Sequence, residues 1–110
     1  MAVTINIFYT GEGTNARRFA EEMVSGGTVE KIRAEEGNLL YEYFFPMDDE
    51  RTVLLIDSWE NQQALDVHHS SPMMKTIMDL REKYDLHMKV DRYVSDVDGI
   101  PQTDTAYLKE

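Results

Sequence analysis

The chain has 110 residues, the length of one domain, and 42% hydrophobic with 29% charged residues is the composition of a folded protein. Eleven Lys and Arg stand against 21 Asp and Glu, a formal net charge of −10, which argues against nucleic acids and anionic membranes as partners. The sequence contains no cysteine, which excludes disulfides, zinc–thiolate sites, iron–sulfur clusters and thiol nucleophiles.

The N-terminal ten residues predict a strand and not an export signal. Val3 to Tyr9 is rich in β-branched and aromatic residues, and Gly11 to Gly13 then supplies a turn. Met1 to Thr10 carries no Lys or Arg, and its apolar residues are spaced rather than continuous. Elsewhere no apolar run approaches the roughly 20 residues of a membrane helix. We therefore expect a cytoplasmic protein.

An amphipathic helical region follows the first turn. Thr14 is a candidate N-cap, and the next apolar residues repeat at helical spacing: Ala16, Phe19, Ala20 and Met23. Gly26 and Gly27 break or kink this helix, and Val29 and Ile32 then restore its apolar stripe until Gly37. One bent helix and two short helices both fit the pattern.

The middle of the chain predicts an antiparallel hairpin. Leu39 to Phe45 is a dense run of strand-forming residues closed by Pro46. The acidic turn Met47 to Arg51 separates it from a second such run, Thr52 to Ser58.

Two helical segments and a strand complete the pattern. Asn61 to Ser70 places Ala64, Leu65 and His68 on one helical face. Ser71 and Pro72 then supply an N-cap followed by proline at the first helical position. The second helix has a stripe made of Met73, Ile77, Leu80 and Tyr84. Lys89 to Val94 is the last predicted strand.

This order of elements predicts an α+β fold of the ferredoxin-like, split βαβ type, with an antiparallel sheet and both helical regions on one face. Residues 1–94 form the predicted domain. Residues 95–110 are rich in Asp, Gly, Pro and Thr, and we expect a tail that is loose or packed on a neighbouring subunit.

The hairpin lacks the apolar and polar alternation of a sheet that is covered on one side. Leu39 to Phe45 contains one charged residue, Glu42, and Val53 to Ile56 is apolar throughout. Both faces are therefore expected to be buried, although two helical regions cover only one. We predict a homodimer that stacks sheet against sheet, with a lipid or another protein on that face as the alternative.

Seven residues follow the spacing W-E-x3-A-L-x2-H-x2-S-P. They are Trp59, Glu60, Ala64, Leu65, His68, Ser71 and Pro72. This spacing resembles the antibiotic biosynthesis monooxygenase (ABM) family, including its quinol-monooxygenase-like members. Further residues fit the family's pattern: Glu35, Gly37, Leu39, Tyr41, Glu42, Arg92 and Tyr93. The resemblance covers about residues 3 to 94. It implies a dimeric α+β barrel, in a family that includes cofactor-independent oxygenases and relatives that process small signalling molecules.

This sequence differs from the family's pattern in two ways, and each difference argues against one kind of reaction. Relatives often carry a second histidine five residues after the first, where this chain has Met73, so a two-histidine mechanism is not expected. Haem-degrading members use an asparagine in the first strand, a tryptophan at the position of His68 and a histidine at that of Met78. Of these, Asn6 alone is present, and haem cleavage is not expected.

His68 is the first candidate catalytic residue, because its helical face directs the ring between helices and sheet. An imidazole is the side chain most easily poised to accept a proton near neutral pH. A hydrogen-bonded structural histidine is the alternative. His69 points about 100° away around the helix, so the pair does not suit one metal ion, and no metal site is predicted.

Asn6 is the second candidate, because an amide on the first strand can orient a substrate oxygen or O₂, or else bond to neighbouring backbone. Asp57 and Glu42 are strand carboxylates expected to orient His68 or to pair with Arg92. An apolar, adaptable substrate cavity is predicted from a set of methionines and large side chains, which would otherwise form solid core. The set is Phe8, Tyr43, Phe44, Trp59, Met73, Met74, Ile77 and Met78, with Trp59 interpreted chiefly as a packing residue.

The resemblance and these residues together favour a monooxygenase that oxidises a small, electron-rich aromatic or quinol-like compound with O₂. His68 would remove a phenolic proton, the anion would pass an electron to O₂, and Asn6 or a water would steady the developing oxyanion. Because the substrate supplies the reducing power, no cofactor is expected. The alternatives are an isomerase or other acid–base enzyme acting on a small carbonyl metabolite, and a non-catalytic small-molecule-binding dimer.

Overall fold

A four-stranded antiparallel sheet forms the base of the molecule. The structure is a computed structural model that describes residues 1–109. The strands are β1 (Val3–Thr10), β2 (Asn38–Phe44), β3 (Thr52–Trp59) and β4 (His87–Val94), in the order β2-β3-β1-β4. This is the α+β, ferredoxin-like arrangement that the sequence predicts. The hairpin strand β2 lies at one edge of the sheet, whereas β1 and β3 occupy its centre.

The side chains of the two central strands point alternately toward the helices and away from them, as expected for a sheet that is covered on one face. Val3 and Tyr9 on β1 are buried, and their partners Trp59 and Val53 on β3 are buried beside them. These odd-numbered positions face the helices and form the floor of the hydrophobic core. The even-numbered positions of β1 and β3 form the outer face of the sheet.

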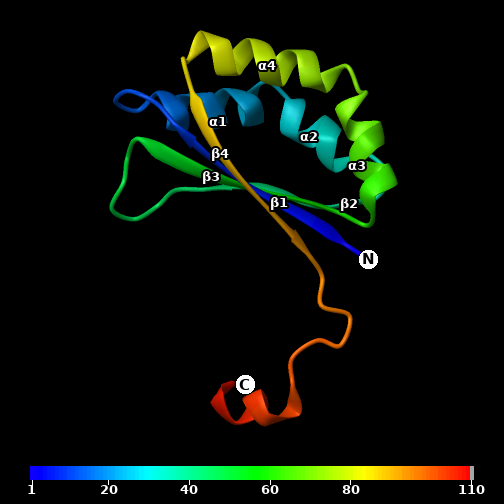
Figure 1. Cartoon of the computed structure of the whole chain (residues 1–110). Coiled ribbons are helices and arrows are strands. Elements are labelled where there is room, and N and C mark those ends of the chain that lie inside the picture. Colours follow the sequence, from blue (N-terminus) through cyan, green and yellow to red (C-terminus); the bar gives the residue numbers. More distant parts are fainter. Residues whose placement is uncertain (110) are drawn as a thin grey trace.

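Four α-helices of the described residues lie on the inner face (Figure 1). They are α1 (Asn15–Ser25), α2 (Thr28–Arg33), α3 (Gln62–His69) and α4 (Met73–Lys83). The first helical region is therefore two helices and not one bent helix. Gly27 separates them with a φ of 82°, in the left-handed region that an L-residue rarely adopts.

The starts of α3 and α4 differ from each other. Asn61 caps α3, since its side-chain oxygen accepts a hydrogen bond from the Ala64 N–H at 2.8 Å. The cap predicted at Ser71 does not form: Pro72 is the N-cap residue of α4, and within residues 1–109 the buried Ser71 hydroxyl has no hydrogen-bond partner. The Ser71 N–H instead bonds to the carbonyl of His68, which turns the chain from α3 into α4.

The outer face of the sheet carries an exposed apolar patch between polar residues such as Asn6, Glu42 and Lys89. Leu40, Phe44 and Tyr93 are 37%, 40% and 54% exposed, and the side chains of Phe8, Leu54 and Ile56 lie half-buried between them. Within residues 1–109, no helix packs on this face (Figure 1). The second covering layer that the hairpin composition predicts is therefore not supplied by this part of the chain.

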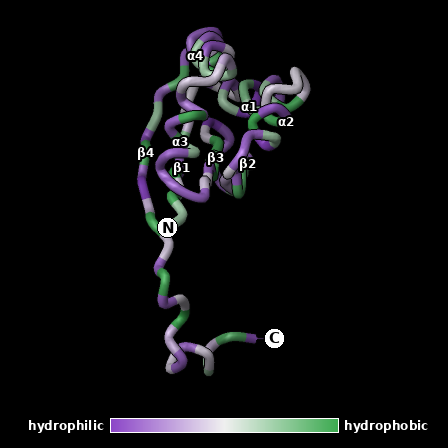
Figure 2. The backbone as a smooth tube through the Cα atoms, turned by 90° about the vertical axis from the view of Figure 1, so that its right-hand side faces the viewer, coloured by the Kyte–Doolittle hydropathy of each residue, from purple (hydrophilic) through white to green (hydrophobic). Residues whose placement is uncertain are grey.

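The C-terminal segment after β4 leaves the body of the protein. It contains a short 3₁₀ helix, Gln102–Tyr107, and runs away from the side of the sheet that carries the helices (Figure 2). Its apolar residues are exposed: Val97, Ile100, Tyr107 and Leu108. Among the residues described, no helix is long and apolar enough to cross a membrane.

Candidate functional site

A half-open cavity of about 320 Å³ lies between the inner face of the sheet and helices α3 and α4. Its floor follows the register of the strands in three rows. The first row is Asp57, Ile5 and Arg92; the second is Leu55, Ile7 and Val90; the third contains Tyr9 and Met88. The roof is supplied by Leu65, His68 and His69 from α3 and by Met74, Ile77 and Arg81 from α4.

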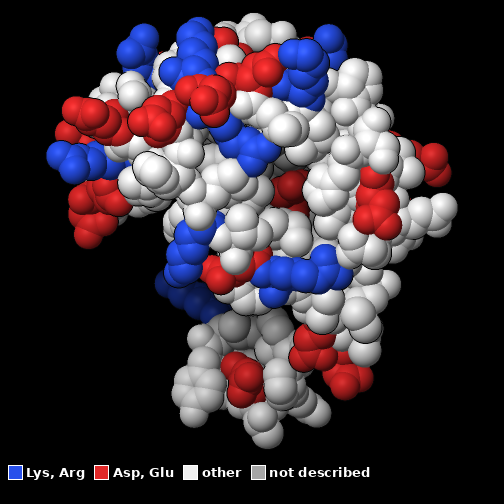
Figure 3. All heavy atoms as spheres, turned by 45° about the horizontal axis from the view of Figure 1, so that its top comes forward, with Lys and Arg blue, Asp and Glu red and all other residues white. Residues whose placement is uncertain are grey.

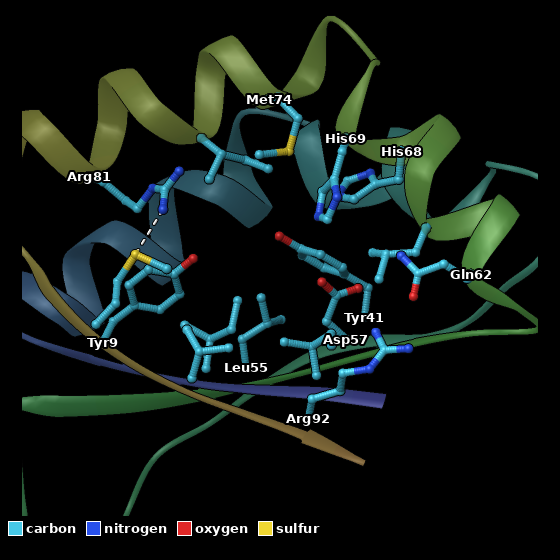
Figure 4. A pocket seen from close by; sticks show the side chains of 16 residues that line it. Tyr9, Tyr41, Leu55, Asp57, Gln62, His68, His69, Met74, Arg81 and Arg92 are labelled. Atoms are coloured by element: carbon cyan, nitrogen blue, oxygen red, sulfur yellow. Dashed lines mark hydrogen bonds between the residues drawn. The ribbon is translucent and has the colours of Figure 1, made fainter. Parts of the chain in front are cut away.

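The two ends of the cavity are polar and its middle is apolar. Figure 4 shows His68, Asp57, Tyr41 and Arg92 at one end, Tyr9 and Arg81 at the other, and Leu55 between them. The Arg81 guanidinium donates to the Met88 sulfur at 2.7 Å, which holds this arginine over the third row. The cavity therefore suits a ligand with an apolar body and polar ends.

His68 is held by a carboxylate behind it. Its ring is 2% exposed, and Nδ1 lies 2.7 Å from Oε1 of Glu35, in the segment that follows α2. Because Nδ1 is occupied by this carboxylate, Nε2 is the ring nitrogen left to meet a ligand. A histidine with an acidic partner on one nitrogen and a cavity beside the ring is an arrangement that can accept and return a proton.

Trp59 and Asp57 form a second unit beside the histidine. The Trp59 ring stacks on His68 with centroids 4.7 Å apart and an interplanar angle of 25°. Its Nε1–H donates to Oδ1 of Asp57, which is 5% exposed. Burial raises the pKa of Asp57 to about 6, although the Trp59 hydrogen bond and the His68 charge oppose this rise. Asp57 is thus a second group at this end that can hold a proton near neutral pH.

Two buried tyrosines supply neutral hydroxyls. Burial raises the pKa of Tyr9 to about 12, with the charge of Arg81 opposing the rise, and burial also raises the pKa of Tyr41 well above its usual value. Both phenols therefore stay protonated and serve as hydrogen-bond donors toward the cavity (Figure 4).

Comparison with known proteins then settles the family. A sequence profile described as Antibiotic biosynthesis monooxygenase matches residues 2–80, more than two thirds of the chain. This chain belongs to the antibiotic biosynthesis monooxygenase family. A search of curated proteins gave no match.

Solved structures share the fold of this ABM protein at low sequence identity. A protein from Pseudomonas aeruginosa is 22% identical over 87% of this chain and 95% of its own, with a TM-score of 0.74. A candidate antibiotic biosynthesis monooxygenase from Deinococcus radiodurans is 18% identical over 87% and 93%, with a TM-score of 0.73. SnoaB, a cofactor-independent oxygenase from Streptomyces nogalater, is 15% identical over 86% and 93%, with a TM-score of 0.70.

The structure brings some of the predicted site residues of this ABM protein together. His68, Met74 and Ile77 line the cavity, and the Trp59 ring stacks on the ring of His68. Met73 packs partly buried against the core, whereas Met78 is 57% exposed and does not line the cavity. Tyr43 stands in the second row, on the edge strand β2 next to Leu55, and lines a separate surface hollow beside α1.

Three other candidates lie on the opposite side of the sheet. Asn6 and Phe8 are even-numbered residues of β1, paired with Ile56 and Leu54 on the outer face, and Phe44 pairs with Leu54 there. A strand sends successive side chains to opposite faces, so Asn6 and His68 of one subunit do not share a site. The idea that Asn6 steadies an oxyanion formed beside His68 is corrected accordingly.

The carboxylate that orients His68 is Glu35, and not Asp57 or Glu42 as the sequence suggested. Glu42 pairs with Ile56 on the outer face, and Asp57 bonds to Trp59. Arg81 was also missed, because a lone arginine on an amphipathic helix gives no sequence signal. Glu35 could have been found from its place in the segment that resembles the family.

No three His, Asp or Glu side chains come together as a metal-binding group in the part of the chain that the structure describes. The chemistry that this site offers through its own residues is hydrogen bonding and proton transfer, around His68 and Asp57 at one end of an apolar cavity.

Proposed function

We propose that this ABM protein is a cofactor-independent monooxygenase that oxidises a small electron-rich aromatic or quinol-like compound with O₂. The observation that carries the proposal is the His68–Glu35 pair at the end of an apolar cavity. Family membership supports the reaction class, and the structural relative SnoaB is a cofactor-independent oxygenase.

The proposed reaction begins with proton removal. His68 Nε2 takes the proton of a substrate phenol, and the negative charge of Glu35 stabilises the imidazolium that results. The electron-rich phenolate then reduces O₂ directly. One oxygen atom replaces a ring C–H as a carbonyl and the other leaves as water, so the substrate supplies all four electrons. The neutral Tyr41 hydroxyl is placed to donate a hydrogen bond to a developing oxyanion.

The test is O₂ consumption by protein freed of flavin and metal, measured with an oxygen electrode on a panel of hydroquinones and hydroxynaphthalenes. His68→Gln should lower the rate by roughly 100-fold or more, the range for a general base. His87→Gln, at an exposed histidine outside the cavity, is the matched control and should leave the rate unchanged. No O₂ consumption above background with the wild-type protein would overturn the proposal.

The same pair would also serve an acid–base reaction without oxygen, such as isomerisation of a small carbonyl compound. Substrate turnover under nitrogen that depends on His68 would select that reaction. Binding without turnover, unchanged in His68→Gln, would instead select a non-catalytic binding protein.

We further propose that the functional unit is a homodimer formed through the outer face of the sheet. The exposed Leu40, Phe44 and Tyr93 support this, since large apolar patches on isolated subunits are uncommon. A two-fold partner would cover the patch.

The domain then ends with β4, and residues 95–109 act as a tail that packs on the partner subunit; Glu110, the last residue of the predicted tail, lies outside the described residues. The exposed apolar side chains of the segment up to residue 109 support this assignment, as does its path away from its own helices (Figure 2). The proposed location is the cytoplasm.

A further inference from the structure

The cavity has one end without a negative charge. Among residues 1–109, Asp57 is the single acidic residue of the lining, and it stands in the same row of the floor as Arg92, with Ile5 between them. Arg92 makes no ion pair in the described part of the chain, but it shares this row with the Asp57 carboxyl group. Arg81 lies two rows away, beside Tyr9 and Met88.

Arg81 is held in place but not neutralised. No carboxylate lies within ion-pair distance of its guanidinium in the described part of the chain, although the protein carries 21 acidic residues. Its one side-chain hydrogen bond is to the Met88 sulfur, a weak acceptor. In Figure 3, blue side chains flank a hollow in which red atoms are visible. An unneutralised arginine half-buried in an acidic protein is suited to bind an anion from outside.

A second donor stands beside this arginine. The Tyr9 hydroxyl stays protonated because burial raises its pKa to about 12. The nearby positive charge of Arg81 opposes this rise. Figure 4 shows the Tyr9 phenol and the Arg81 side chain converging on the same end of the cavity. A guanidinium and a phenol O–H together match the two oxygens of a carboxylate.

The dimensions of the cavity set the size of the ligand. Four residues of extended strand separate Ile5 from Tyr9, or about 13 Å, and seven helical residues separate Met74 from Arg81, or about 10 Å. The volume of about 320 Å³ is about twice that of a cavity known to hold one benzene ring. The apolar middle formed by Leu55, Ile7 and Val90 therefore fits roughly two aromatic rings.

We propose that Arg81 is a specificity-determining residue and that the substrate is a two-ring aromatic acid, with its carboxylate on Arg81 and its phenol facing His68. The position of the phenol rests on the proposed function, whereas the binding of the carboxylate does not. The proposal thus narrows the substrate class from quinols in general to hydroxyaryl acids.

The experiment compares two probes that differ in the carboxylate. 6-Hydroxy-2-naphthoate carries a phenol and a carboxylate at opposite ends of two rings, and 2-naphthol lacks the carboxylate. Their dissociation constants are measured by calorimetry under nitrogen, so that no oxidation takes place. The proteins are the wild type, Arg81→Gln, Arg81→Lys and a control, Lys75→Gln. Lys75 is an exposed cation of the same helix, so its variant makes the same change in net charge outside the cavity.

The wild type should bind the acid at least tenfold more tightly than 2-naphthol. Arg81→Gln should weaken binding of the acid by roughly tenfold or more, the scale of a charge-assisted hydrogen bond, and leave 2-naphthol within twofold. Arg81→Lys should retain part of the affinity, and Lys75→Gln all of it. Equal affinity of the wild type for both probes, or equal weakening of both probes in Arg81→Gln, would overturn the proposal.

The two proposals fail separately. Tight, Arg81-dependent binding of the acid without O₂ consumption would leave the carboxylate site standing and remove the oxygenase. O₂ consumption with 2-naphthol as good a substrate as the acid would keep the oxygenase and remove the role of Arg81.

Discussion

Glu35 Oε1 lies 2.7 Å from His68 Nδ1, across 33 residues of sequence. The contact joins the segment after α2 to the last turn of α3, and so ties the first half of the fold to the second at the cavity wall. Trp59 packs on the ring of the same histidine, which fixes the plane of the imidazole as well as its hydrogen bond. The imidazole is thereby positioned before any ligand arrives, and such preorganisation is what proton transfer requires.

Glu35→Gln tests the role of this carboxylate as a positioning residue. The amide keeps the size of the side chain but removes the negative charge that stabilises a protonated His68. We expect kcat for O₂ consumption to fall roughly tenfold or more with little change in KM, and Glu35→Asp to recover part of the loss. Glu36→Gln, at the exposed neighbouring residue, is the control. A similar fall in both Gln variants would remove Glu35 from the mechanism.

Asp57→Asn tests the buried carboxyl through the pH dependence of stability. Burial raises the pKa of Asp57 from 3.8 to about 6, so between these values the folded protein keeps a proton that the unfolded chain has lost. The contribution of Asp57 to the free energy of unfolding is therefore full below about pH 4 and is lost as the pH rises through about 6. Asparagine does not titrate. Relative to wild type, the variant should gain roughly 2 to 3 kcal/mol of stability between about pH 4 and pH 7.

Urea unfolding of both proteins at several pH values measures this difference directly. Asp48→Asn changes the net charge equally at an exposed turn and is the control. A stability difference between wild type and Asp57→Asn that does not vary with pH would show that Asp57 titrates normally in the folded protein.

Val90→Phe tests the apolar middle of the cavity. Val90 and Val94 point to the same side of β4 and are 52% and 53% exposed, but only Val90 lines the cavity. Phenylalanine at position 90 should occupy ligand space and weaken binding of a two-ring phenol by roughly tenfold, while Val94→Phe should not. Thermal melting should be within a few degrees of wild type for both, since neither residue is buried. Equal effects of the two substitutions on binding would place the ligand elsewhere.

The fold was predictable because its signals are local. The periodicity of Ala16, Phe19, Ala20 and Met23 predicts a helix that buries those residues, and the structure buries them. The sequence fits either one bent helix or two short helices in this region, and one backbone torsion distinguishes them. Gly27 has a positive φ and separates α1 from α2. Helix capping was less predictable, since serine is a common N-cap residue but the Ser71 hydroxyl does not cap α4.

The candidate site was predictable only in part, because it depends on which residues face each other across the fold. Helical periodicity is enough to direct His68 inward, but its partner Glu35 comes from a non-helical segment whose side-chain direction no period specifies. Asn6, in contrast, is a residue whose side-chain direction the sequence does specify. Its parity already separates it from Ile5 and Ile7, which line the cavity, so strand alternation alone places it on the outer face.

Phe44→Glu tests the proposed dimer. In a two-fold interface each substitution introduces two carboxylates into an apolar patch, and the chain already carries a net charge of −10. We expect sedimentation of wild type as a dimer at micromolar concentration and of the variant as a folded monomer. Val24→Glu places the same charge at an exposed apolar position of α1 and should remain dimeric. Leu40→Glu repeats the test should Phe44→Glu fail to fold. A monomeric wild type at that concentration would contradict the proposal.

Truncation after Asp96 tests the tail. The cut keeps Ser95, whose N–H and hydroxyl bond to Ala2 and close the end of the sheet, so the folded body should be unaffected. The segment removed carries four apolar side chains that are 54% to 88% exposed within residues 1–109: Val97, Ile100, Tyr107 and Leu108. If they pack on the partner, the shortened protein should dissociate at roughly tenfold or more higher concentration, because several apolar side chains lose their contact area. When both proteins also carry Phe44→Glu, the shortened monomer should melt at the same temperature as the full-length monomer. Unchanged dimer affinity would mean that the tail makes no contact with the partner, and the dimer would then rest on the sheet face alone.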